Sequence, residues 1–182
     1  MPSTLWTIGH STRSLDDFLA LLRAYSIALV ADVRRFPGSQ RYPQYNQDSL
    51  AASLEDVGIG YRHYPGLGGR RAARGADSPN NGWRVSAFNA FADHMDSAEF
   101  VTALDDLIRQ AEGASTVIMC SEAVPWRCHR RLIADALLVR GWEVRDIIAT
   151  NKTEPHRLTD FAQVDGVRLT YPAEPLFPTK EP

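Results

Sequence analysis

Segments with the character of buried strands alternate with segments of helical periodicity along most of this chain. We expect strands at residues 5–10, 27–33, 61–64, 115–120, 143–148 and 167–171. Apolar side chains recur at helical spacing over residues 14–25, 48–57, 86–95, 97–112 and 126–139. Strands separated by helices predict an α/β fold, with a mainly parallel sheet and helices on both faces in a three-layer α/β/α arrangement.

The length of 182 residues suits a single domain. We expect its core to lie within about residues 5–150, followed by a C-terminal strand and a proline-rich tail over 151–182. No apolar run reaches the roughly 18 residues of a membrane helix, and the N-terminus lacks the pattern of a secretory signal. The protein is therefore expected to be soluble and cytoplasmic, with no membrane partner.

Polar residues and glycines follow four of the predicted strands. In an open parallel sheet, ligands bind outside the carboxyl ends of the strands, so these residues are predicted to form one pocket. The candidates are His10, Ser11, Asp32, Arg34, Ser39, Gly68, Gly69, Arg70, Cys120, Glu122, Arg127, Cys128, His129 and Arg130. The irregular segment 65–83, which supplies the two glycines, is long enough to be either functional or disordered.

Arginine is concentrated in these loops. All but two of the 20 basic residues are arginine, and half of the arginines follow the second, third and fourth strands. Because guanidinium groups match carboxylate and phosphate, we predict an anion site. Its residues would be Arg34, Arg70, Arg127 and Arg130, with Ser11, Ser39 and the backbone of Gly68 and Gly69. The alternative is that the arginines are solvated loop residues of an arginine-rich chain.

The segment from Cys120 to Arg131 is the most informative about function, because it contains both cysteines, a histidine and three arginines. Pro125 suits the first turn of a helix, which would place Cys128, His129 and Arg130 near the positive end of its dipole. A thiol in that position is acidified, so Cys120 or Cys128 is a candidate nucleophile or redox centre. The alternatives are a small buried side chain at Cys120 and helix packing at Cys128. The spacing fits no zinc pattern, so neither a metal nor a cofactor is predicted.

His10, Asp32 and Glu122 are candidates for proton transfer, and His129 joins them through its position beside Cys128. A hydrogen-bonded core position is the alternative for His10, and an ion pair with a nearby arginine is the alternative for Asp32. Four aromatic residues either stack a base or sugar or belong to the local core: Tyr42, Tyr45, Trp83 and Trp126.

Three common signatures are missing from the chain. It has no Gly-x-x-x-x-Gly-Lys-Ser/Thr phosphate loop, no Gly-x-Gly-x-x-Gly after the first strand and no Gly-x-Ser-x-Gly elbow. Their absence argues against ATP hydrolysis, dinucleotide redox chemistry and serine-hydrolase chemistry.

Four ordered motifs occupy the predicted loops. They are Thr7-Ile-Gly-His-Ser11, Asp32-Val-Arg34 with Pro37 and Ser39, Gly66-Leu-Gly-Gly-Arg70, and Cys120-x-Glu122 with Cys128-His-Arg130. Together, over about residues 5–150, they resemble the domain-of-unknown-function family 488. The resemblance implies a compact α/β domain and marks the motif residues as the site, and it brings no established activity.

Three functions remain open. The first is an enzyme, a hydrolase or transferase, that acts on a small anionic ligand of phosphorylated or nucleotide-like character. The second is a nucleic-acid-binding or processing module, against which the net charge of −2 argues. The third is a non-catalytic sensor of an anion or of redox state, through a Cys120–Cys128 disulfide. The sequence leaves the substrate and the oligomeric state open.

Overall fold

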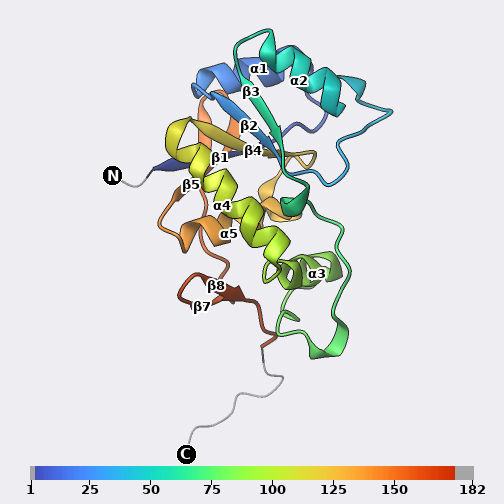
Figure 1. The fold of residues 1–182 in the computed structure, drawn as a ribbon, viewed down its shortest axis with the longest axis vertical. Coiled ribbons are helices and arrows are strands. Elements are labelled where there is room, and N and C mark those ends of the chain that lie inside the picture. Colours follow the sequence, from blue (N-terminus) through green and yellow to red (C-terminus); the bar gives the residue numbers. More distant parts are fainter. Residues whose placement is uncertain (1–2, 175–182) are drawn as a thin grey trace, which may run out of the picture.

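The fold is built on a six-stranded sheet, shown in Figure 1 in a computed structural model that describes residues 3–174. The strands of this sheet are β1 (Thr4–Gly9), β2 (Leu29–Asp32), β3 (Gly60–His63), β4 (Thr116–Cys120), β5 (Glu143–Ala149) and β6 (Lys152–Pro155). The helices are α1 (Leu15–Ala24), α2 (Gln47–Glu55), α3 (Ser86–His94), α4 (Ala98–Gly113) and α5 (Arg130–Leu138). A separate two-stranded sheet consists of β7 (Gln163–Asp165) and β8 (Arg168–Thr170).

The main sheet is parallel except at one edge. Its strand order is β3-β2-β4-β1-β5-β6, and only β6 runs antiparallel to its neighbour. The register pairs Gly9 with Cys120, and it pairs Asp32 with both Met119 and His63. The carboxyl ends of β1, β2, β3 and β4 therefore lie level with one another along one edge of the sheet.

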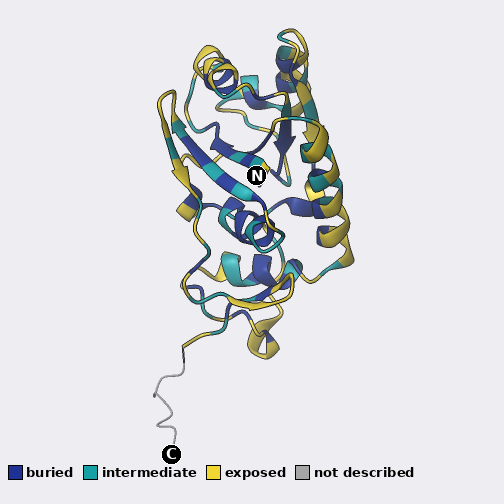
Figure 2. Ribbon diagram, turned by 90° about the vertical axis from the view of Figure 1, so that its left-hand side faces the viewer, coloured by how far each residue is buried: buried dark blue, intermediate teal, exposed yellow. Residues whose placement is uncertain are grey.

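Helices cover both faces of the sheet. Alternate residues of β4 enter different apolar clusters: Val117 and Met119 pack with side chains of α1 and α2, whereas Ile118 packs with those of α3, α4 and α5. Figure 2 shows buried strands and the exposed outer face of the helices. The predicted three-layer α/β/α fold is thus confirmed. Within residues 3–174, no helix has the combined length and hydrophobicity needed to cross a bilayer.

Local sequence signals fix several helix ends. Ser14 Oγ accepts a hydrogen bond from Asp17 N at 3.1 Å, so Ser14 caps α1 as its residue type favours. The helix expected over 126–139 begins only at Arg130, because the chain forms a short 3-10 helix at Pro125–Arg127 and is extended at Cys128. The prediction that Cys128 lies in the first turn of this helix is therefore wrong.

The chain after residue 150 contains more strand than its sequence pattern indicated. The strand expected at 167–171 is β8, and it pairs with β7 rather than with the main sheet. Neither β6 nor β7 was predicted, because both are mostly exposed and lack apolar alternation. Most of the proline-rich tail, residues 175–182, lies outside the described residues.

Candidate functional site

The carboxyl ends of the parallel strands open into one cleft of about 770 Å³. Backbone pairing continues past the strand ends, since His10 N donates to Cys120 O at 2.9 Å and Val33 N donates to Met119 O at 3.0 Å. The loops after β1, β2 and β4 are therefore held side by side. The predicted residues that line the cleft are His10, Ser11, Arg34, Ser39, Gly69, Arg70, Cys120, Glu122, Arg127, Cys128 and His129.

Three of the predicted residues lie outside the lining of the cleft and support it from behind. Asp32 is fully buried and forms an ion pair with Arg34. Gly68 packs so closely on Arg35 that a Cβ atom at this position would lie 2.6 Å from Arg35 Cα. Arg130 is 1% exposed, and its contacts are with the protein itself.

Arg130 contacts the sulfur atoms of both cysteines. Its guanidinium Nε donates to Cys120 Sγ at 3.0 Å, and its backbone N donates to Cys128 Sγ at 3.4 Å. Both cysteines are free thiols and nearly fully buried at the floor of the cleft. A neighbouring guanidinium favours the ionised form of a thiol, so Arg130 supplies a counter-charge for a thiolate in this pair.

The other donors of Arg130 meet neutral acceptors. Nη1 donates to Thr7 Oγ1 at 2.9 Å, and Nη2 donates to the carbonyl oxygen of Glu122 at 2.8 Å. Thr7 in turn donates to Asp146 Oδ1 at 2.5 Å. Within residues 3–174, no carboxylate forms a direct ion pair with Arg130, so the sulfur atoms are the contacted groups that can become anionic.

His129 is oriented to accept a proton from Cys128. Its Nε2 lies 2.9 Å from the carbonyl oxygen of Val33. Because a carbonyl oxygen only accepts, Nε2 carries the hydrogen and Nδ1 of the neutral ring keeps a lone pair. That Nδ1 lies 3.6 Å from Cys128 Sγ, which gives a thiol–imidazole pair of the kind that activates cysteine nucleophiles. The described residues contain no group of three or more His, Cys, Asp or Glu side chains that could hold a metal ion.

The two thiols differ in acidity. Burial raises the pKa of Cys120 well above its ordinary value, and the adjacent Cys128 raises it further. Burial also opposes ionisation of Cys128, but a hydrogen bond from Cys120, together with His129 and Arg130, holds the pKa of Cys128 well below its usual range. The Nε contact of Arg130 by itself would favour a thiolate at Cys120. We assign the thiolate to Cys128 because His129 Nδ1 lies 3.6 Å from its sulfur and can take up its proton, and because the backbone N of Arg130 donates to the same sulfur.

Arg34 is fixed at the back of the cleft by Asp32. Nε donates to Oδ1 at 2.9 Å and Nη2 donates to Oδ2 at 2.6 Å, so the pair is bidentate. Tyr61 donates its hydroxyl to the same carboxylate at 2.7 Å, and burial beside Asp32 raises the pKa of Tyr61. Both carboxylate oxygens are engaged, so Asp32 serves to position Arg34.

His10 presents a neutral ring to the cleft. Its Nδ1 donates to Ser11 O at 2.9 Å, which leaves Nε2 as the acceptor that faces Arg34 Nη1 at 3.4 Å. The ring stacks on Tyr45, with centroids 4.0 Å apart and planes 14° from parallel. Burial lowers the pKa of His10 to about 4, and the charge of Arg34 adds to this effect. His10 therefore remains unprotonated at neutral pH.

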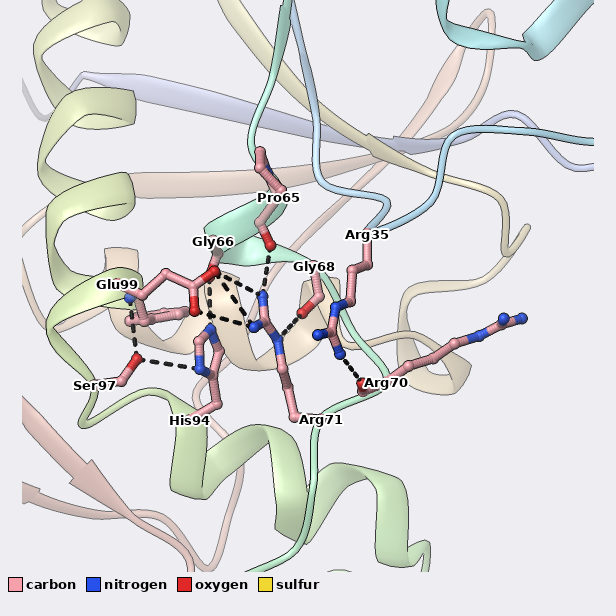
Figure 3. A network of polar contacts seen from close by, with 10 residues as sticks. Arg35, Pro65, Gly66, Gly68, Arg70, Arg71, His94, Ser97 and Glu99 are labelled. Atoms are coloured by element: carbon pink, nitrogen blue, oxygen red, sulfur yellow. Dashed lines mark hydrogen bonds and ion pairs between the residues drawn. The ribbon is translucent and has the colours of Figure 1, made fainter.

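A polar network ties down the loop that carries Gly69 and Arg70 (Figure 3). Arg71 donates to Gly68 O at 2.9 Å and forms an ion pair of 3.1 Å with Glu99 on α4. The guanidinium of Arg35 donates to the carbonyl oxygen of Arg70. The Arg70 side chain itself extends away from this network, so the loop is held while the Arg70 guanidinium has no carboxylate partner within residues 3–174.

The backbone of the cleft is unusual at three positions. Ser11 and Arg70 have left-handed backbone, with φ of 49° and 59°. Non-glycine residues seldom adopt this conformation, and it concentrates at functional sites. At Gly9, a Cβ atom would lie 1.7 Å from the carbonyl oxygen of Glu122, so β1 and the cysteine loop meet backbone to backbone.

Sequence reasoning missed several residues of the site. They are Tyr61 and Asp146 on strands, and Phe36, Phe88 and Phe91 in the lining of the cleft. The strand residues act through a neighbour, which leaves no trace in the sequence pattern. Phe88 and Phe91 follow helical spacing and are indistinguishable from core residues. Of the candidate stacking residues, Tyr42 lines the cleft, whereas Tyr45 and Trp83 are buried in the apolar clusters.

The chain is similar to one protein family over most of its length. A family model described as Domain of unknown function DUF488 matches residues 14–137, which is more than half of the chain. This range includes the motifs at Asp32, Gly68 and Cys120 and begins after His10 and Ser11. No match was found among curated proteins or among solved structures. The chain belongs to the family described as Domain of unknown function DUF488, as the resemblance of its loop motifs predicted.

Proposed function

We propose that this protein is an enzyme that uses the Cys128 thiolate to act on a small anionic substrate, phosphorylated or nucleotide-like in character. The observation that carries the proposal is the contact of the buried Arg130 with both sulfurs at the floor of the cleft. A buried guanidinium is costly unless an anion accompanies it, and the groups in direct contact with Arg130 that can become anionic are the two thiols. The thiolate is also the reactive form of cysteine.

Four residues are proposed to hold the substrate anion: Arg34, Arg70, Arg127 and Ser11. Arg34 is preorganised by its bidentate pair with Asp32 and by the neutral ring of His10. Arg70 and Arg127 are exposed on the lining of the same cleft. Guanidinium forks match the oxygens of phosphate and carboxylate, so this set favours an anionic group beside the thiols.

The proposed reaction proceeds through a covalent intermediate. His129 Nδ1 accepts the thiol proton of Cys128, and the sulfur attacks the electrophilic centre of the substrate. The bond to the leaving group breaks, and the leaving group departs with the electron pair and takes the proton from His129. A water molecule, or another nucleophile in transfer, then attacks the intermediate, gives its proton to His129, and releases Cys128 as the thiolate.

The proposal is tested by the pH dependence of alkylation. We would label the protein with iodoacetamide from about pH 5 to about pH 9 and locate the modified cysteine by peptide mass spectrometry. Cys128 is expected to reach half of its maximal rate at least one pH unit below the value of about 8.5 for a free thiol. Labelling should persist in Cys120→Ser and be lost in Cys128→Ser. A half-maximal rate for Cys128 at a pH above about 7.5 would overturn the proposal.

The same pair of sulfurs favours a second candidate function, a redox sensor. Both thiols contact one arginine and both are free, so oxidation by hydrogen peroxide would join them in a disulfide and release two water molecules. A sensor would lose two hydrogen atoms in mass without forming dimers, and the change would reverse with dithiothreitol. Oxidation that stops at a sulfenic acid on Cys128 alone would contradict this second function.

A further inference from the structure

The cleft concentrates positive charge although the whole chain carries a net charge of −2. Its lining includes Arg35, Arg41, Arg70 and Arg127, and none of these forms an ion pair with a carboxylate of residues 3–174. The one acidic residue in the lining of the described cleft is Glu122. Four guanidinium groups and one carboxylate leave more positive charge than a ligand with a single negative charge would neutralise. The arrangement therefore favours a ligand with at least two negative charges.

One wall of the cleft is aromatic. Phe36 lines it with 65% of its surface exposed, and the guanidinium of Arg35 lies 5.3 Å from the centre of its ring. Tyr42 and Arg41 repeat this pairing at 5.5 Å. A guanidinium beside an aromatic ring forms a flat cationic surface on which a nucleobase stacks. Phe36 adds little to the core at this exposure, so a stacking role accounts for its position.

The size of the cleft agrees with a ligand larger than a simple anion. A volume of about 770 Å³ lies within the range of small-molecule and cofactor sites and is far more than inorganic phosphate would fill. Phe88, on α3, also lines the cleft. The lining therefore combines guanidinium groups with aromatic side chains.

We infer that the ligand of this cleft is a nucleotide, with its phosphate on the guanidinium groups beside the thiols and its base against Phe36 and Arg35. The inference rests on the proposed function only in placing the reacting end of the nucleotide near Cys128. A free mononucleotide and the end of a single strand share this chemistry, and the experiment separates these two sources.

Binding is measured by calorimetry on the doubly substituted protein, Cys120→Ser with Cys128→Ser, so that no reaction takes place. The probes are the four nucleoside 5′-monophosphates, ribose 5-phosphate and a short single-stranded oligonucleotide. At least one monophosphate is expected to bind roughly ten-fold or more tightly than ribose 5-phosphate, the gain that stacking of one base provides. Phe36→Ala should remove that gain and leave ribose 5-phosphate binding unchanged, whereas Val85→Ala, an exposed apolar residue outside the cleft lining, should change neither.

A second measurement keeps the test valid if the doubly substituted protein does not fold. In the wild-type protein, the same monophosphate should slow alkylation of Cys128 at concentrations at which ribose 5-phosphate has no effect. Tighter binding of the oligonucleotide than of any monophosphate would identify a strand end as the source, and equal or weaker binding would identify the free nucleotide.

Equal affinity for the monophosphates and ribose 5-phosphate would overturn the inference. The outcome is independent of the proposed function. Nucleotide binding without an acidified thiol would contradict the proposed enzymatic function and support the nucleotide site. An acidified thiol in a protein that does not prefer nucleotides would support the proposed enzymatic function and contradict the nucleotide site.

Discussion

The guanidinium Nε of Arg130 lies 3.0 Å from the Sγ atom of Cys120. Both side chains are almost completely buried, and the backbone N of the same arginine reaches Cys128 Sγ. One residue therefore links the start of α5 to the end of β4 and places a positive charge beside two thiols. This relationship makes the acidity of the thiols depend on a side chain that does not line the cleft.

Arg130→Met should raise the pKa of the cysteine pair, because it removes the buried positive charge. We expect the pH of half-maximal alkylation to increase by at least one unit. The free energy of unfolding should fall by about 2 kcal/mol, because Thr7 and the carbonyl of Glu122 lose their donors. Arg131→Met is the matched control, since Arg131 contacts Thr159 and Trp83 instead. Unchanged thiol acidity in Arg130→Met would contradict the assigned role.

Asp32→Asn should destabilise the fold strongly. It leaves the guanidinium of Arg34 buried without its carboxylate, a loss that typically costs about 3–5 kcal/mol. Urea denaturation measures the change. Glu154→Gln serves as the control, because its ion pair with Lys152 is exposed and should contribute less than about 1 kcal/mol. Equal losses in the free energy of unfolding for the two substitutions would show that the buried Asp32–Arg34 pair stabilises the fold no more than the exposed pair does.

Gly9→Ala should disrupt the junction of β1 with the cysteine loop. The added Cβ would lie 1.7 Å from the carbonyl oxygen of Glu122, so the strand and loop must separate. We expect a loss of at least about 3 kcal/mol in the free energy of unfolding, together with slower alkylation of Cys128. At Gly38 nothing lies within 4 Å of the added atom, so Gly38→Ala should stay within about 0.5 kcal/mol of the wild-type value.

The stability of the protein should fall as the pH decreases below 6.5, in part because of His10. The pKa of His10 is about 4 in the folded protein, against the ordinary value of 6.5 that a histidine has in an unfolded chain. Between these two values the unfolded state binds a proton that the folded state does not, so this contribution to stability rises with pH across the window and is constant outside it. The contribution is on the order of 3 kcal/mol.

His10→Phe is expected to remove this part of the pH dependence while keeping a ring against Tyr45. Urea denaturation at about pH 7 and about pH 4 measures the difference in both proteins. An equal decrease in the wild-type protein and in the variant would show that His10 does not titrate as described.

The alternation of strands and helices, and the loops that meet at the site, could be predicted from local sequence signals. Buried runs such as residues 115–120 and helices with serine caps, such as Ser14, are local signals that the chain carries without its tertiary context. The rule that ligands bind at the carboxyl ends of parallel strands then brought His10, Arg34 and Cys120 to one edge, and all three line one cleft.

Which groups act together depends on contacts that form only in the folded chain. Whether Asp32 transfers protons or forms an ion pair depends on its contact with Arg34, and the register of β2 against β4 sets where Asp32 lies. The link from Asp146 through Thr7 to Arg130 joins residues distant in sequence, so no spacing reveals it. Helical periodicity extended α5 through Cys128, because periodicity does not detect an extended residue that interrupts a helix. Contacts between distant residues depend on packing, and packing is a property of the whole fold.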